Sequence, residues 1–252
     1  MREDYSLEKK RFLELANKAY NSGIYTFTDF LGLGEQSAFH EIERELFGIP
    51  YRLFGGAEGC ERVMIRFGSE ELCGYDMPYP ISIIHCRPVA EKFAEKLSHR
   101  DFLGAILNLG IERAVLGDII FTEEGTYIFA KENIADFIAE SLTRVRKTSV
   151  KCSITEKLPE GKLYNTKTVK VQAVGERIDA LVAKVFSMSR DDASTLFSRG
   201  LIFINGRLCE SASHKLKEGD IVSARGHGRF IYRGVENLTK KGKLNIIIEL
   251  YV

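Results

Sequence analysis

The chain has 252 residues, and 36 lysines and arginines stand against 35 aspartates and glutamates, so its formal net charge is +1. A charge this small excludes a uniformly basic nucleic-acid-binding coat, and contact with an anionic partner has to come from a local basic patch. Hydrophobic residues make up 44% of the sequence, which is enough for packed cores, and the length favours two or three small domains over one.

Neither a membrane segment nor a metal site is expected. No apolar run reaches 18 residues and the first ten residues, MREDYSLEKK, do not resemble a signal peptide, so we expect a cytoplasmic protein that contacts no membrane. The cysteines are odd in number and widely spaced: Cys60, Cys73, Cys86, Cys152 and Cys209. Without a Cys-x-x-Cys motif or a Cys/His ligand pair, reduced thiols are favoured over disulfides or zinc, and no cofactor is expected.

Residues 1–77 are predicted to form helices followed by a hairpin. Apolar residues recur at helical spacing over 5–20, and a second helical pattern covers 37–47. Strand patterns over 51–54 and 61–68 flank a glycine cluster, which lacks the Gly-Lys-Ser/Thr ending of a phosphate-binding loop. A hairpin loop is therefore our interpretation of that cluster.

Residues 78–158 predict an RRM-like, or ferredoxin-like, domain. The elements expected in chain order are a buried strand around Ile81–Ile84, a helix over 99–109, a hairpin over 117–133, a helix over 134–145 and a strand over 150–158. That order is the split βαβ arrangement. An RNA-binding sheet of this kind displays aromatic side chains on its central strands, and here only Tyr127 and Phe129 are candidates. The sheet is thus either a scaffold or protein-docking surface, or an incomplete platform for RNA bases.

The string His99-Arg100-Asp101 is the nearest approach to a catalytic motif. Pseudouridine synthases carry His-Arg-Leu-Asp, in which the aspartate comes one residue later than Asp101 does here. A kinase catalytic loop is excluded because no glycine-rich loop or Asp-Phe-Gly accompanies it. We interpret Ser98 as a helix N-cap with Asp101 as its capping partner. An RNA-modifying enzyme that uses these residues remains the alternative function.

The region 159–174 is predicted to be a linker, and the last domain covers 175–252. Its first helix follows from Ile178, Leu181 and Val185, which share one face, and Ser189 is the predicted N-cap of a second helix that stops at Gly200. Asn205-Gly206 then predicts a tight hairpin, and a turn over 217–220 leads into a strand over 221–224.

Basic residues exceed acidic residues in this last domain by about three between Gly175 and Arg233. Arg190 lies in the first turn of its helix, where a cation opposes the helix dipole, and Asp191 and Asp192 offset that cost. Arg190 is therefore a candidate ligand for an outside anion such as phosphate. A solvated, salt-bridged face is the alternative explanation of the same charges.

Several short motifs occur in the order found in the S-four-type RNA-binding domain, which this region resembles. They are Arg177-Ile178-Asp179, Ser189-Arg190, Ser198-Arg199-Gly200, Ile204-Asn205-Gly206, Gly219-Asp220 and Gly226-His227-Gly228-Arg229. The resemblance implies binding to structured RNA through the first two helices and the hairpin. The candidate contact residues are Arg177, Lys184, Ser189, Arg190, Ser194, Arg199, Asn205, Arg207, Lys215 and Arg229. Of these, we expect Arg177, Lys184, Arg190 and Arg207 to share one phosphate-binding surface.

Nearly the whole chain resembles the YlmH-type RNA-binding proteins, also described as photosystem II RNA-binding-domain proteins. The resemblance rests on SHRDFLGAILNLGIERAVLGDI in the middle, the C-terminal motifs and the tail LTKKGKLNIIIELYV. It implies an α+β protein with a helical N-terminal region, an RRM-like middle domain and a small S-four-type domain with a C-terminal strand extension.

The same resemblance implies a function. We expect a monomeric, non-enzymatic factor that binds ribosomal RNA on the large ribosomal subunit in quality control of stalled peptidyl-tRNA complexes. Peptidyl-tRNA and quality-control factors are then further partners. A ribosome-assembly or division-linked interaction protein is an alternative that needs no enzyme.

Overall fold

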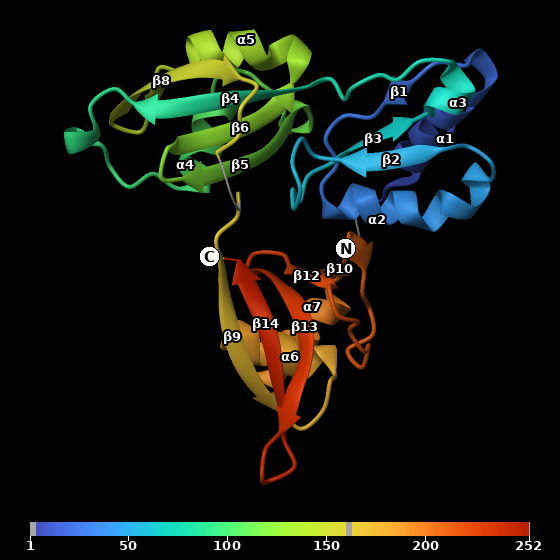
Figure 1. The fold of residues 1–252 in the computed structure, drawn as a ribbon, viewed down its shortest axis with the longest axis vertical. Coiled ribbons are helices and arrows are strands. Elements are labelled where there is room, and N and C mark those ends of the chain that lie inside the picture. Colours follow the sequence, from blue (N-terminus) through green and yellow to red (C-terminus); the bar gives the residue numbers. More distant parts are fainter. Residues whose placement is uncertain (1–3, 160–162, 252) are drawn as a thin grey trace. The chain divides into compact units, whose positions relative to one another are not determined.

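A computed structural model describes residues 4–159 and 163–251, and its ribbon is shown in Figure 1. The chain divides into two compact units. One contains Ser6–Gly32 and Glu41–Leu163, and the other contains Leu33–His40 and the chain from Tyr164 onward. Both contain antiparallel sheets and helices, so the expected α+β class is confirmed. No helix among the described residues is long and apolar enough to cross a membrane.

The N-terminal region contains the predicted helices and hairpin, and an additional short strand, which was not predicted, makes its sheet three-stranded. The helices are α1 (Ser6–Ser22), α2 (Leu33–Ile42) and the short α3 (Glu70–Cys73), with a 3-10 turn over Glu43–Leu46. The strands lie in the order β1 (Thr26–Phe27), β3 (Met64–Phe67), β2 (Tyr51–Phe54). The hydroxyl of Thr26 donates a 2.8 Å hydrogen bond to the Leu15 carbonyl, which joins α1 to the sheet.

The middle sheet has five antiparallel strands in the order β5-β6-β4-β8-β7 (Figure 1). Their bounds are β4 Ile81–Pro88, β5 Leu116–Thr122, β6 Gly125–Lys131, β7 Arg144–Val145 and β8 Thr148–Thr155. The helices are α4 (His99–Leu107) and α5 (Glu132–Ser141), with 3-10 turns over Glu91–Phe93 and Arg113–Val115. The strand, helix, hairpin, helix, strand order is confirmed. One boundary was wrong, because the helix expected to reach residue 145 ends at Ser141 and Arg144–Val145 pairs with β8 instead.

One face of this sheet packs against both helices, and the N-terminal region covers part of the other. Ile84, Ile128, Phe102 and Ile138 meet in the core between sheet and helices. On the opposite face Phe129 is fully buried. A side chain at Gly56, in the loop between β2 and β3, would collide with the Phe129 ring.

An arginine and an aspartate fix this contact between the hairpin loop and the middle sheet. Asp118 on β5 accepts hydrogen bonds from the backbone amides of Glu61 and Arg62 at 2.8 and 2.9 Å. The Arg62 side chain donates to the carbonyl of Leu116 at 2.8 Å and to that of Phe30 at 2.7 Å. The loop of the N-terminal hairpin is thus hydrogen-bonded to strand β5 of the middle sheet, although the two sheets are separate.

The two aromatic candidates for base stacking are covered. Phe129 lies under the hairpin loop, and the Tyr127 ring stacks on His85 at 4.3 Å with an interplanar angle of 5°. The Tyr127 side chain is nearly fully buried. Of the two explanations left open by the sequence, this burial favours a scaffold over a stacking platform.

The cysteine expectation was wrong for one pair. Cys86 on β4 and Cys152 on β8 stand directly opposite each other in the strand register and form a disulfide. The two residues are separated by 66 positions in sequence, so spacing alone does not show that the sheet brings them together. The cysteines at 60, 73 and 209 remain thiols.

The C-terminal sheet has six strands in the order β11-β10-β12-β13-β14-β9. Their bounds are β9 Thr166–Ala173, β10 Ile202–Ile204, β11 Arg207–Leu208, β12 Ile221–Ala224, β13 Gly228–Leu238 and β14 Leu244–Tyr251. The helices α6 (Ile178–Val185) and α7 (Arg190–Ser198) pack on one face around a core that includes Leu181, Phe197 and Phe230.

The predicted linker was wrong over half its length. Residues 160–162 lie outside the described residues, but Thr166–Ala173 is the edge strand β9 and pairs with β14 from Thr166↔Tyr251 to Ala173↔Leu244. Val171 and Ala173 point into the core, whereas Lys170 and Gln172 are exposed. This period-two alternation is that of a half-buried strand.

The turns predicted in this module are confirmed. Gly200 has a φ of +67° and ends α7, as a C-terminal glycine does in the left-handed region. Asn205 and Gly206, with φ of +49° and +79°, connect β10 to β11. Two positive φ values in a two-residue loop match the type I′ hairpin that Asn-Gly predicts.

Candidate nucleic-acid interface

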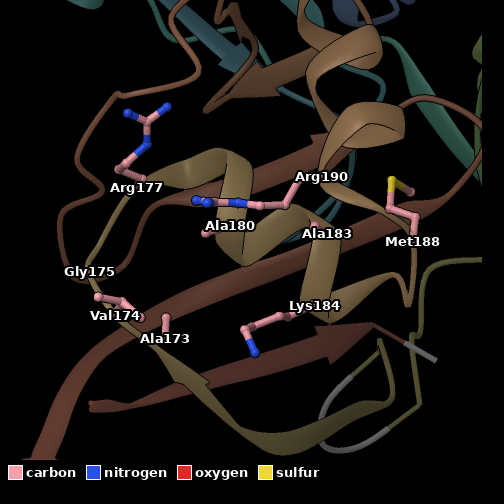
Figure 2. Close-up of a pocket in the computed structure, with 9 residues that line it drawn as sticks. All are labelled: Ala173, Val174, Gly175, Arg177, Ala180, Ala183, Lys184, Met188 and Arg190. Atoms are coloured by element: carbon pink, nitrogen blue, oxygen red, sulfur yellow. The ribbon is translucent and has the colours of Figure 1, made fainter. Parts of the chain in front are cut away.

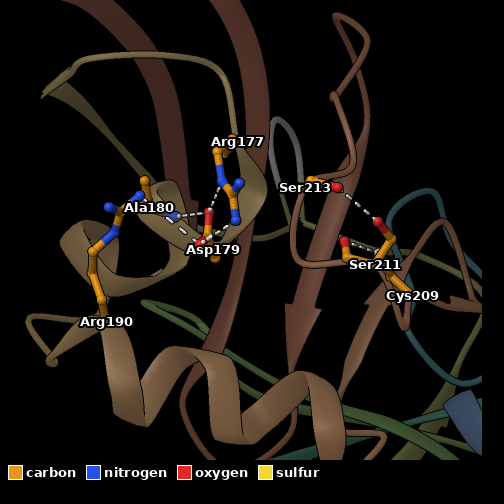
Figure 3. Close-up of polar contacts among 7 residues, drawn as sticks. All are labelled: Arg177, Asp179, Ala180, Arg190, Cys209, Ser211 and Ser213. Carbon is orange, nitrogen blue, oxygen red and sulfur yellow. Dashed lines mark hydrogen bonds and ion pairs between the residues drawn. The ribbon is translucent and has the colours of Figure 1, made fainter.

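A buried carboxylate organises the start of α6. Asp179 is 5% exposed and lies beside Ile178 and Leu181, both fully buried. Arg177 donates from Nε to Asp179 Oδ1 at 3.1 Å and from Nη2 to Oδ2 at 3.0 Å (Figure 3). The Ala180 amide adds a 2.8 Å hydrogen bond to Oδ1. A buried charge is tolerated only when it is paired and hydrogen-bonded, and Asp179 meets both conditions.

Arg190, from the first turn of α7, approaches the same carboxylate. Its Nη2 lies 3.8 Å from Asp179 Oδ2, so one acid lies between two arginines (Figure 3). Burial is the strongest influence on Asp179 and disfavours its charge. The Arg177 hydrogen bonds, the Ala180 amide and the two guanidinium charges outweigh it and hold the pKa of Asp179 below its usual value. Asp179 is therefore ionised at neutral pH.

Both arginines remain accessible although they contact Asp179. The side chain of Arg177 is 55% exposed and that of Arg190 is 65% exposed. A guanidinium has five N–H donors, and the two bonds from Arg177 to Asp179 use only part of that capacity. The remaining donors can meet an outside anion, and the assignment of Arg190 as an anion ligand stays a prediction.

These cations border a hollow of about 600 Å³ beside α6 (Figure 2). Its apolar lining comes from Ala180 and Ala183 on α6, Val174 in the loop after β9, and Met188 before α7. Ala180 and Ala183 are three residues apart on the helix and so share a face. Their short side chains leave the space open.

Three of the predicted contact residues line this hollow, namely Arg177, Lys184 and Arg190. In Figure 2 the Arg190 side chain extends across α6 towards Ala180, and Lys184 projects on the side of Ala173. Arg207, the fourth member of the expected surface, lies on β11 and is not among the lining residues. Three of the four residues are thus grouped at this hollow, and the place of Arg207 on the same phosphate-binding surface stays a prediction.

Arg177 lies near Lys184, but not because the two residues share a face of one helix, as was predicted. Seven-residue spacing was expected to put Arg177 and Lys184 on one face of a helix. Arg177 is the N-cap of α6 and has extended backbone, so it is not part of the helix. It is fixed by its bond to Asp179, and by an isolated backbone bridge to Lys215, which brings Lys215 next to it.

Two predicted contact residues have structural roles in the fold. The Ser189 hydroxyl oxygen accepts a 3.0 Å bond from the Asp192 amide and caps α7, as expected. The Asn205 amide group donates to Asp220 at 2.8 Å and accepts from the Ile221 amide at 2.9 Å. These bonds fix the hairpin against the following strand.

The other three predicted residues lie away from the hollow. Ser194 and Arg199 are exposed, Ser194 within α7 and Arg199 at its C-terminal end. The Arg229 guanidinium on β13 lies between two rings, 4.5 Å from the centroid of Tyr164 and 3.9 Å from that of Tyr251. Neither Arg199 nor Arg229 lines the hollow.

The sequence predicted the cations at the hollow but not the residues that determine its shape. Asp179 was counted among the acids, although its place between Ile178 and Leu181, inside an apolar stripe, indicates burial. Ala180 and Ala183 gave no signal, because alanine is common in helices for reasons unrelated to binding.

The catalytic alternative at 99–101 receives no geometric support. Asp101 accepts hydrogen bonds from the Ser98 amide at 2.8 Å and from the Ser98 hydroxyl at 2.6 Å, which forms the predicted cap of α4. These bonds hold the pKa of Asp101 below its usual value, with a smaller contribution from Arg146. Among the described residues, no three His, Cys, Asp or Glu side chains are arranged to hold a metal ion.

Comparison with known proteins decides the family. The chain is 30% identical to the ribosome-associated protein quality control protein P2 of Bacillus subtilis strain 168 over 251 residues, covering 98% of this chain and 93% of that protein. The chain belongs to the YlmH family. Residues 77–158 match the family described as "Putative RNA-binding domain in YlmH".

A solved structure from the same family is also similar. The cell division protein ylmH from Streptococcus pneumoniae is 22% identical and aligns with a TM-score of 0.45, over 62% of this chain and 95% of that one. A likeness of this size adds nothing to the assignment of fold or function.

Proposed function

We propose that this YlmH-family protein is a non-enzymatic factor that binds ribosomal RNA on the large ribosomal subunit, in quality control of stalled peptidyl-tRNA complexes. The C-terminal module is its main RNA-binding part. The observation that carries this proposal is the group of three cations, Arg177, Lys184 and Arg190, around one hollow. The Bacillus relative, named for ribosome-associated quality control, supports the choice of the ribosome as partner.

A small local group of cations is sufficient for RNA binding on electrostatic grounds. Each phosphate neutralised by a protein cation releases counterions, and this release supplies much of the affinity for RNA. The chain as a whole has a net charge of +1, so long-range attraction to RNA is weak and contact depends on where cations gather. The buried Asp179 holds Arg177 with two hydrogen bonds and attracts Arg190 from 3.8 Å, which lowers the entropy lost when Arg177 meets phosphate.

The middle domain is assigned a supporting role in this proposal. Its aromatic side chains Tyr127 and Phe129 are buried, and the N-terminal hairpin covers part of the face where RNA-binding sheets of this class stack bases. The buried rings are not available to stack bases, so we assign this domain, which matches the putative RNA-binding family, to holding the N-terminal region and to a smaller share of the RNA affinity than the C-terminal module.

Co-sedimentation with separated ribosomal subunits tests the proposal. The full chain should pellet with large subunits, more strongly when they carry peptidyl-tRNA, and less with small subunits. The variant with Lys184→Ala and Arg190→Ala should pellet less. Equal recovery with both subunits, or undiminished recovery of the variant, would contradict the assignment.

A further inference from the structure

The hollow beside α6 contains more apolar surface than phosphate binding requires. Phosphate is held by charges and N–H donors, and these are already supplied by the three cations at its border. Yet the lining between them is made of Ala180, Ala183, Val174 and Met188. Val174 is 86% exposed, so its side chain is accessible to a ligand in the hollow. The lining indicates a second, apolar part of the same ligand.

We propose that the hollow receives an unpaired nucleobase turned out of its stack, while Arg177, Lys184 and Arg190 hold the flanking phosphates. The inference rests on the proposed function, and it names the feature of the RNA that the site selects. A nucleotide combines a flat, largely apolar body with an adjacent anion, and the hollow combines an apolar floor with adjacent cations. Proteins that read RNA take unstacked bases from loops and bulges in this way.

The arrangement of the side chains suits a flat group. The Arg190 side chain extends across α6 above Ala180, so a base lying on the alanine face meets its guanidinium (Figure 2). Guanidinium planes stack on bases as well as bonding to phosphates. The volume of about 600 Å³ falls within the range of roughly 300 to 1,000 Å³ found for small-ligand sites.

An acidic protein segment with an apolar side chain is the competing occupant. Asp179 fixes the plane of Arg177 with two bonds, so a rigid planar donor set lies beside the hollow. Such a fork binds carboxylate and phosphate alike, so the choice of RNA over this segment rests on the proposed function. The experiment below separates the two occupants.

Filling the hollow without changing charge is the test. Ala180→Leu places a larger apolar group on the floor, and its matched control is Gln172→Leu, which adds leucine to the exposed side of β9 away from the helices. The probes are two RNA hairpins with the same stem and the same number of phosphates. One has a single bulged adenosine, and the other has an abasic site at that position.

The full-length wild type should prefer the bulged adenosine by about tenfold, since stacking on one base contributes roughly 1–3 kcal/mol. Ala180→Leu should bind both hairpins nearly equally and keep the salt dependence of the wild type. Gln172→Leu should retain the preference. Val174→Asn, at an exposed position where folding is not at risk, should lose part of it.

Three results would overturn the inference in distinguishable ways. If the wild type binds both hairpins equally with steep salt dependence, the base is not recognised, and the proposed RNA-binding function stands. If it binds neither hairpin, the proposed function fails together with this inference. A preference that survives in both Ala180→Leu and Val174→Asn would show that the base is recognised elsewhere on the protein and not in the hollow.

Discussion

Asp179 sets the direction of two arginines, so at the scale of single residues it is an acid that shapes a basic site. Its carboxylate accepts two bonds from Arg177 and one from the Ala180 amide, with Arg190 at 3.8 Å. If only net charge mattered, Asp179 would weaken the attraction of this region for RNA, and its removal would strengthen RNA binding. The geometry shows instead that Asp179 orients the arginines beside it, so its removal should weaken RNA binding.

Asp179→Asn should weaken RNA binding, although it makes the module more positive. The asparagine keeps the shape and one acceptor oxygen but loses the charge that holds both guanidinium groups. Stability should fall by about 1 kcal/mol, a modest loss because Arg177 is more than half exposed and its charge is screened by solvent. Urea denaturation and RNA titration measure the two effects. Tighter RNA binding would show that net charge outweighs position.

The acid sensitivity of the fold should also change with this substitution. The pKa of Asp179 is lowered in the folded state, so its contribution to stability is fully present above the unfolded value of about 4 and is lost as pH falls through the lowered value. Asp179→Asn should therefore lose less stability than the wild type between about pH 5 and pH 3. Denaturation midpoints over this range check the prediction, and parallel curves would refute it.

Asp101→Asn tests the catalytic alternative. Asp101 accepts two hydrogen bonds from Ser98 at the start of α4, so its loss should weaken that cap slightly. Ribosome binding and cellular function should persist, because in the proposed non-enzymatic function no reaction depends on this carboxylate. Complementation of a deletion strain, alongside a melting curve, provides the measurement. Loss of function in a stable, ribosome-binding variant would restore the enzyme hypothesis.

At the scale of elements, the sequence predicted the helices, caps and turns whose structure depends on residues close together in the chain. The helix containing Ile178 and Leu181, the cap at Ser98 and the turn at Asn205-Gly206 all follow from residues within a few positions of each other. Strand β9 was not predicted, because it is a strand only through its pairing with β14, which lies more than seventy residues later in the sequence.

The disulfide and the hollow escaped prediction for similar reasons. Cys86 meets Cys152 only because β4 and β8 become neighbours in the sheet. The hollow exists because the side chains of Ala180 and Ala183 are small. A small residue in a helix gives no sequence pattern that would indicate a cavity. The cations around it were predictable from charge and motif order, whereas their grouping depends on the Asp179 contact.

Gly56 connects the N-terminal hairpin to the middle sheet and gives a prediction at this scale. Its φ is +100°, and a Cβ there would lie 2.5 Å from Phe129 Cδ1. Gly56→Ala should destabilise the protein by about 2 kcal/mol through strain and collision. Gly74→Ala is the matched control, with φ of +79° and nothing within 4 Å of the added Cβ. Urea denaturation should show the larger loss for Gly56→Ala, and equal losses would mean that Phe129 is not covered as described.

At the scale of the whole molecule, a nearly neutral chain groups the cations that we propose bind RNA in one module. The middle sheet buries its aromatic side chains and carries the N-terminal hairpin, and the C-terminal module presents Arg177, Lys184 and Arg190 around an apolar hollow. If these residues bind RNA, the salt dependence of RNA binding should come from a few side chains in the C-terminal module rather than from the net charge of the protein.

The salt dependence of binding to a ribosomal RNA hairpin is the most direct measurement of this claim. Lys184→Ala with Arg190→Ala removes two cations beside the hollow and leaves the Arg177–Asp179 pair intact. Lys170→Ala with Lys240→Ala removes the same charge from β9 and from the turn after β13. The first variant should lower the slope of log K against log salt by about two, since each phosphate contact contributes close to one, and the control should leave it unchanged. Parallel slopes for wild type and both variants would contradict phosphate binding at the hollow.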